Sequence, residues 1–122
     1  MRISLPSGTP AELVVPEGRP ATRGLVLWSD IFGLRPLFVD HARRLADDRG
    51  WAVCVVEPFG GQEDLDLDQR QAAAAALVDA DKVADAVAAA DACGVEPVGV
   101  LGFCMGGMYA MKSLAASGRF DR

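Results

Sequence analysis

The sequence predicts an α/β fold in which a mainly parallel sheet is flanked by helices. Short runs of Val, Leu and Ile alternate with longer segments of helical periodicity, and the connections between them are short. The apolar runs are also nearly continuous, which is typical of strands covered on both faces. A strand–helix order with short connections favours parallel pairing. A chain of 122 residues has the length of one domain or of a part of one.

The first half of the chain contains three expected strands and one helix. The strands cover residues 11–16, 24–30 and 51–58, which are rich in Val and Leu. Between the last two, residues 35–50 carry apolar side chains at helical spacing. Gly50 stands where a C-cap glycine belongs, so the helix is expected to end there.

The second half begins with an acidic segment that leads into an alanine-rich run ending at residue 92. Acidic side chains suit a helix N-terminus, and alanine has the strongest helix propensity. We therefore expect a helix whose alanines and Leu77 face the core, while Asp79, Lys82 and Asp85 face water. Residues 97–103 form the fourth expected strand, and residues 106–117 the helix that follows it.

Composition excludes several functions. The net charge of −5 offers no basic stripe for nucleic acid. Cys54, Cys93 and Cys104 form no CxxC pair and His41 is the single histidine, so neither a metal site nor a cofactor is predicted. The longest uncharged stretch, residues 97–111, is shorter than the roughly 20 residues that span a bilayer. Without an apolar signal core at the N-terminus, a cytoplasmic protein with reduced thiols and no membrane partner is expected.

The chemistry is expected at Gly102-Phe103-Cys104-Met105-Gly106, where a predicted strand meets a predicted helix. This is the G-x-nucleophile-x-G elbow, whose sharp turn strains the apex residue and leaves room only for glycine two positions before and after it. The turn places the thiol at a helix N-terminus, where free N–H groups stabilise a thiolate. The N–H of Met105 would then receive an oxyanion.

The glycines and cysteines of the chain also allow other interpretations. The glycines do not follow the G-x-G-x-x-G order of a dinucleotide site, and the Lys-Ser/Thr of a phosphate loop is absent. A cysteine in an apolar segment is usually a small core residue, and we apply that interpretation to Cys54 and Cys93. A thiol-redox role for Cys104 is disfavoured because no resolving cysteine lies near it.

Three segments together resemble the dienelactone hydrolase family: "LWSDIFGL" at residues 27–34, "VVEPFGG" at residues 55–61 and "GFCMGG" at residues 102–107. The resemblance covers essentially the whole chain. It implies the α/β-hydrolase type of fold and hydrolysis of carboxylic esters or lactones by a cysteine nucleophile, here Cys104. It also implies that the N–H of Ile31 is the second oxyanion donor beside Met105.

The chain departs from the family pattern at two places. The family carries Glu-Ile-Phe-Gly after the strand, and its glutamate pairs with the resting thiol; here the shorter Asp30 holds that position. The alternative is that Asp30 caps the next helix. Arg70 matches the family arginine that grips a substrate carboxylate, but Ala74 stands where the family has tyrosine. The alternative for Arg70 is a solvated surface charge.

An elbow nucleophile also needs a histidine and an acid, which follow it in α/β-hydrolases. After Cys104 the chain contains Asp121 and no histidine, while His41 lies upstream and is expected to be a surface helix residue rather than a displaced base. We therefore expect residues 1–122 to be a single partial domain, truncated after the elbow helix and inactive by itself. A second hypothesis is a non-catalytic α/β module, which would pair with a partner or with its own copy through the open edge of strand 97–103.

Overall fold

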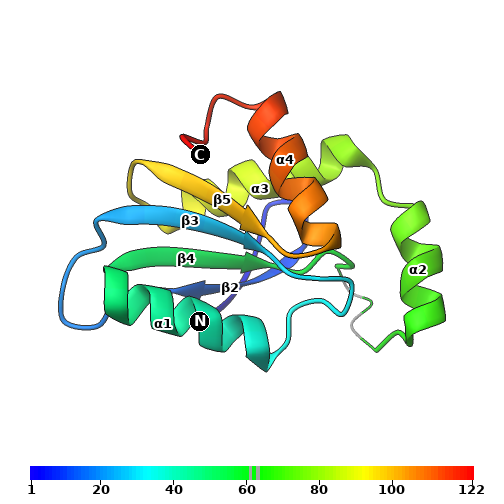
Figure 1. Ribbon diagram of the computed structural model, residues 1–122, viewed down its shortest axis with the longest axis horizontal. Helices are drawn as coiled ribbons and strands as arrows, with labels where there is room; N and C mark the ends of the chain where they lie inside the picture. Colours follow the sequence, from blue (N-terminus) through cyan, green and yellow to red (C-terminus); the bar gives the residue numbers. More distant parts are fainter. Residues whose placement is uncertain (61, 63) are drawn as a thin grey trace.

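The computed structural model describes residues 1–60, 62 and 64–122, so Gly61 of the "VVEPFGG" motif lies outside the described residues. A five-stranded sheet in the order β1-β2-β4-β3-β5 runs through the molecule, with helices on both faces (Figure 1). The strands are β1 Arg2–Ser4, β2 Pro10–Val14, β3 Arg23–Trp28, β4 Trp51–Val56 and β5 Val98–Gly102. The helices are α1 Pro36–Arg49, α2 Leu67–Ala75, α3 Asp79–Cys93 and α4 Met105–Ala116. Among the described residues, none of the helices combines the length and apolar character that a membrane crossing requires.

The predicted parallel pairing is confirmed for the centre of the sheet. β3 pairs in parallel with both β4 and β5. β1 and β2 add an antiparallel hairpin, because β2 pairs antiparallel with β1 and with β4. The sequence did not indicate β1, since its three residues are exposed or half-buried and contain no apolar run.

Two apolar cores lie on opposite faces of the sheet, as the continuous strand patterns predicted. Alternate residues of β3 point to opposite faces: Leu25 and Leu27 to one, Val26 and Trp28 to the other. The first face is covered by buried residues of α1, namely Phe38, Ala42 and Ala46. The second is covered by α3 and α4, which contribute Ala86, Ala89, Ala90, Cys93, Tyr109 and Ala110. α1 also ends at Gly50, whose φ of 71° confirms the predicted C-cap.

The alanine-rich segment forms two helices rather than one. α2 begins with a capping box in which Asp66 and Gln69 exchange side-chain and backbone hydrogen bonds. It ends at Ala75, and Leu77 packs against the core before α3 begins at Asp79. Alanine favours helix throughout the segment, so helix propensity does not indicate where the helix breaks. The break lies at the point where Leu77 packs against the core.

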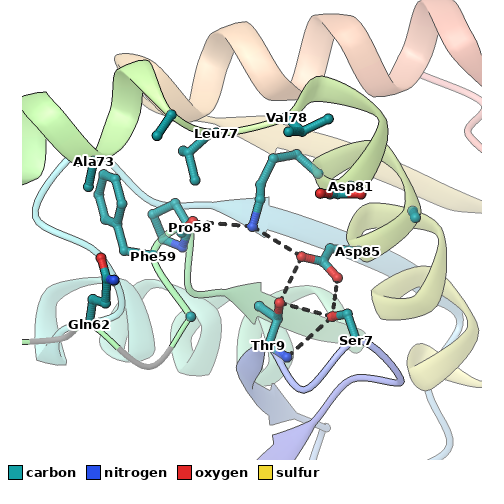
Figure 2. A pocket seen from close by; sticks show the side chains of 14 residues that line it. Ser7, Thr9, Pro58, Phe59, Gln62, Ala73, Leu77, Val78, Asp81 and Asp85 are labelled. Carbon is teal, nitrogen blue, oxygen red and sulfur yellow. Dashed lines mark hydrogen bonds and ion pairs between the residues drawn. The ribbon is translucent and has the colours of Figure 1, made fainter.

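The prediction that Lys82 and Asp85 face water was wrong, although Asp79 is exposed as expected. Their exposed fractions are 7% and 3%. Lys82 Nζ donates to Asp85 Oδ2 at 3.3 Å and to the Pro58 carbonyl at 3.2 Å. Ser7 Oγ and Thr9 Oγ1 donate to the same carboxylate at 2.5 and 2.8 Å, beside a cavity of about 580 Å³ (Figure 2). This buried network joins α3 to the β1–β2 turn and to the end of β4.

The outer edge of β5 is partly occupied, which corrects the expectation that it is unpaired. The N–H of Asp121 donates to the Val98 carbonyl at 3.0 Å, and the N–H of Val100 donates to the Arg122 carbonyl at 2.9 Å. Phe120 is buried in the core just before these bonds. From the first bond to the second, the residue number increases in both segments. Residues 121–122 therefore run alongside β5 in the same direction.

We predict that Asp85→Asn lowers the free energy of unfolding by about 3 kcal/mol or more, because it leaves the buried Lys82 ammonium without its carboxylate. The matched control is Asp79→Asn, whose ion pair with Lys112 is largely exposed to water. An exposed pair contributes less than about 1 kcal/mol. Urea unfolding at pH 7 measures both losses. Equal losses for the two variants would contradict a structural role for the buried network.

Candidate active site

Three neighbouring strands end in register at one edge of the sheet. Their last paired row consists of Val56 of β4, Trp28 of β3 and Gly102 of β5. The segments that follow these residues therefore begin side by side. They carry Glu57, Asp30 and Cys104, and this carboxyl edge is where open α/β sheets bind their ligands.

Cys104 lies between β5 and α4 in the conformation predicted for the apex of the elbow. Its φ is 57° and its ψ is −117°, and the residue is exposed. A non-glycine residue in such a region costs on the order of 1–3 kcal/mol and persists only where the surrounding structure imposes it. Cys104 is thus held outside the core, directly before the first turn of α4.

The two elbow glycines are required by contacts with backbone. A Cβ on Gly102 would lie 2.0 Å from the Gly106 carbonyl oxygen. A Cβ on Gly106 would lie 2.2 Å from the Ser29 carbonyl oxygen and 2.6 Å from that of Trp28. Gly106 is thus needed because α4 abuts the end of β3.

The first amides of α4 follow Cys104 directly in the chain. Gly106 N–H donates to the Phe103 carbonyl at 2.9 Å, and Gly107 N–H donates to the Cys104 carbonyl at 3.0 Å. Met105 is the first residue of α4, so its N–H has no acceptor within the helix. The arrangement places a helix N-terminus and its partial positive charge at the thiol.

The loop after β3 is folded around the carboxylate of Asp30. Asp30 Oδ1 accepts from the Phe32 N–H at 3.0 Å, Oδ2 accepts from Arg35 at 2.6 Å, and the Asp30 carbonyl accepts from the Gly33 N–H at 3.0 Å. The N-cap of α1 is Arg35, so the alternative that Asp30 caps this helix is wrong. Asp30 instead closes a turn of the loop, and its pairing with Cys104 stays a prediction.

Arg70 is buried, with an exposed fraction of 6%, so the interpretation of a solvated surface charge is wrong. Its Nε donates to the Leu65 carbonyl at 2.9 Å and its Nη1 to the Ile31 carbonyl at 3.3 Å. The guanidinium also lies 5.6 Å from the centre of the Phe59 ring. Arg70 therefore connects α2 to the loop that carries Ile31.

Glu57 also lies at this edge, although it was not among the site residues expected from the sequence. It is 1% exposed, and its oxygens accept from the Leu34 N–H at 2.7 Å and the Phe59 N–H at 3.0 Å. Its position in the sequence offers one signal, since an acidic residue directly follows an apolar strand. A carboxylate at such a place is either exposed or, when buried, held by hydrogen bonds. The carboxylate connects the end of β4 to the loop after β3.

His41 differs from the expected surface residue, since it is half-buried against aromatic rings. Its ring is stacked on Phe103 with centroids 5.8 Å apart and an interplanar angle of 16°. Phe38 lies 6.4 Å away. Within the described residues, His41 makes these ring contacts and no hydrogen bond to Cys104.

Cys54 and Cys93 are core residues, as the sequence predicted. Both are buried between β4 and α3, and Cys93 Sγ lies 3.8 Å from the Leu25 carbonyl oxygen. Burial raises the pKa of the Cys54 thiol to about 12 and that of the Cys93 thiol to about 11. These two thiols therefore stay protonated at neutral pH.

The sequence model of the dienelactone hydrolase family matches residues 10–122, which include the elbow, the loop after β3 and the end of β4. The chain belongs to the dienelactone hydrolase family. This membership confirms the resemblance carried by the three sequence segments. It also places the protein in a family of hydrolases with the α/β-hydrolase fold.

Several solved structures are similar to this chain and support the assignment of its fold. A protein named m3DLH shares 26% sequence identity with a TM-score of 0.84. P91, a dienelactone hydrolase-like promiscuous phosphotriesterase from metagenomic libraries, shares 24% identity with a TM-score of 0.85. A cold-adapted esterase from an Arctic intertidal metagenomic library shares 20% identity with a TM-score of 0.73. Each match covers 98% of this chain and 55–56% of the other chain. No curated protein sequence matches the chain.

We predict that iodoacetamide at pH 8 adds one carbamidomethyl group per folded chain, on Cys104. The raised pKa values of Cys54 and Cys93 keep both as unreactive thiols until the pH approaches about 11. Peptide mapping by mass spectrometry identifies the labelled residue, and labelling in urea, where all three should react, is the control. Modification of Cys54 in the folded chain at pH 8 would contradict its burial.

We also predict that Gly106→Ala lowers the free energy of unfolding by about 2 kcal/mol or more, because its Cβ cannot fit against β3. Gly107→Ala is the matched control in the same helical turn, where the nearest atom to an added Cβ is 3.5 Å away. Alanine in a helix interior is favoured over glycine by roughly 0.5–1 kcal/mol, so this variant should be as stable as the wild type or more stable. Urea unfolding compares the two variants. Similar stabilities for both would show that the close approach does not constrain residue 106.

Proposed function

We propose that residues 1–122 carry the nucleophile of a hydrolase that acts on carboxylic esters or lactones, with Cys104 as the nucleophile. The observation that supports this most directly is the strained, exposed position of Cys104 between β5 and α4. Strain of this kind is found where a fold positions a reactive side chain. Membership of the dienelactone hydrolase family supports the same class of reaction.

In the proposed reaction the Cys104 thiolate attacks the carbonyl carbon of the ester, and a C–S bond forms. The carbonyl π electrons move to oxygen, and the oxyanion accepts hydrogen bonds from the N–H groups of Met105 and Ile31. When the carbonyl re-forms, the C–O bond breaks and the alcohol oxygen leaves, so that a thioester remains on Cys104. Water then attacks the thioester, releases the acid and returns the thiol. Each oxyanion donor contributes about 3 kcal/mol to lowering the barrier.

The proton transfers require a base, and we propose that a histidine and an acid outside residues 1–122 supply them. The chain spans about 55% of the length of the solved structures that it resembles, which leaves room for such groups in a longer protein. Residues 1–122 then form a partial domain whose own turnover is feeble. Three cysteines without disulfides support a cytoplasmic location.

Two further roles are proposed from the family pattern. Asp30 would pair with the resting thiol, in addition to accepting from Phe32 and Arg35. Arg70 would bind a substrate carboxylate, with its guanidinium positioned by the bonds to the Ile31 and Leu65 carbonyls. Both residues lie on or against the loop that carries the second oxyanion donor.

A second candidate function is a module that associates through the β5 side of the sheet. Exposed apolar side chains on β5 and α4 favour it, namely Leu101, Met108, Met111 and Leu114. Exposed apolar surface beside a sheet edge is typical of a region that another segment covers. A concentration-dependent change in sedimentation coefficient, together with an inert Cys104, would favour the module over the hydrolase.

We predict that p-nitrophenyl acetate releases about one p-nitrophenolate per chain in a burst, followed by slow turnover, because the thioester forms on Cys104 but lacks a base for its hydrolysis. Stopped-flow absorbance and intact mass measure the burst and the acetyl group. Cys104→Ala should abolish both, whereas the buried-thiol control Cys93→Ala should keep them. A burst that survives in Cys104→Ala would exclude this residue as the nucleophile. Robust turnover by residues 1–122 would contradict the proposed need for groups outside them.

A further inference from the structure

We propose that Glu57 is a positioning residue for the oxyanion site, because its buried carboxylate holds the loop 30–34 that carries the Ile31 N–H. The inference rests on the proposed function, since it concerns the geometry that stabilises the oxyanion. Glu57 does not need to touch the substrate. It acts through the backbone of the loop.

The first support is the hydrogen bonding of the carboxylate. Glu57 Oε2 accepts from the Leu34 N–H at 2.7 Å, and Oε1 accepts from the Phe59 N–H at 3.0 Å. The side chain is 1% exposed, so water does not compete for these bonds. Hydrogen bonds to an ionised acceptor are about twice as strong as those between neutral groups. One carboxylate therefore joins the loop after β3 to the segment after β4.

The second support is the close approach of Gly33 to the same carboxylate. A Cβ on Gly33 would lie 2.6 Å from Glu57 Oε2 and 2.8 Å from Oε1. Gly33 also has a φ of 80°, which side-chain-bearing residues rarely adopt. The loop thus passes directly against the carboxylate, which leaves no room for a side chain on Gly33 while Glu57 keeps its position.

The third support is that the segment carrying Glu57 is itself anchored. The next residue, Pro58, accepts a hydrogen bond from Lys82 at 3.2 Å, and Lys82 is held by Asp85 (Figure 2). On the other side of the loop, Arg70 donates to the Ile31 carbonyl. The segment that carries Glu57 is thus bonded to α3 through Pro58 and Lys82. Through its bond to Leu34, Glu57 holds the loop in a fixed position relative to the core.

These contacts also argue against a role for Glu57 as a general acid or base. Both carboxylate oxygens accept from backbone amides and both are enclosed. A group that exchanged protons with substrate would need at least one oxygen directed toward it. The effect of Glu57 should therefore appear only in steps that develop charge on the carbonyl oxygen.

The test compares two reactions of the same thiol in Glu57→Gln. Acylation by p-nitrophenyl acetate passes through an oxyanion, whereas alkylation by iodoacetamide displaces iodide and develops none. The glutamine NH₂ would face one of the two backbone N–H groups, so that the link between the loop and the segment after β4 is lost at one of its two ends. We expect the rate of acylation to fall by about tenfold or more. This loss is smaller than the roughly 10²–10³-fold decrease in rate that follows removal of a whole oxyanion donor. Alkylation should stay within about twofold of the wild type.

Thr22→Val is the control, because it also removes one side-chain hydrogen bond, to the Gly50 carbonyl, but at the opposite end of β3 and β4 from the loop. It should leave the acylation-to-alkylation ratio unchanged. If Glu57→Gln does not fold, Glu57→Asp serves instead, since the shorter carboxylate cannot reach both amides and should lower the same ratio.

An unchanged ratio in a folded Glu57 variant overturns the inference, as does an equal slowing of both reactions. Either result leaves the proposed function intact if the wild type still shows its Cys104-dependent burst. A wild type without that burst overturns the proposed function itself, and the inference with it.

Discussion

The close approach of Gly106 to the end of β3 is the contact on which the rest of the site depends. Because Gly106 has no side chain, α4 begins directly against the carbonyl oxygens of Trp28 and Ser29. Cys104 stands two residues earlier and must take a positive φ to join β5 to a helix so placed. The same contact brings the first amides of α4 beside the loop after β3. A side chain at Gly106 would separate the nucleophile from that loop.

Buried charges also hold the loops at this edge. The carboxylate of Glu57 and the guanidinium of Arg70 each contact backbone of the loop after β3, and Lys82 contacts backbone after β4. Taking such groups out of water is unfavourable unless every charge finds partners. Their geometry is therefore restrictive, and it positions segments without regular secondary structure. The carboxyl edge owes its shape to these polar contacts as much as to the sheet.

Local features of the sequence predicted much of the site, and distant contacts decided the rest. The elbow at Cys104 could be predicted from the sequence because a nucleophile flanked by glycines two residues before and after it is the local pattern of a tight turn. The end of α1 at Gly50 was readable for a similar local reason. Arg70 was not, since its burial depends on Ile31, 39 residues away. Glu57 was not selected because its partner Leu34 is 23 residues distant and belongs to another loop.

The sequence by itself determined the alternation of strands and helices, the parallel centre of the sheet, the buried thiols and the turn at Cys104. Each of these follows from the composition or spacing of neighbouring residues. Only the tertiary structure decided that the alanine-rich segment breaks, that β1 and β2 add an antiparallel hairpin, and that Asp85 is buried. The physical reason is that a charged side chain enters a core only where partners from elsewhere in the chain meet it. For Asp85 those partners include Ser7, 78 residues away.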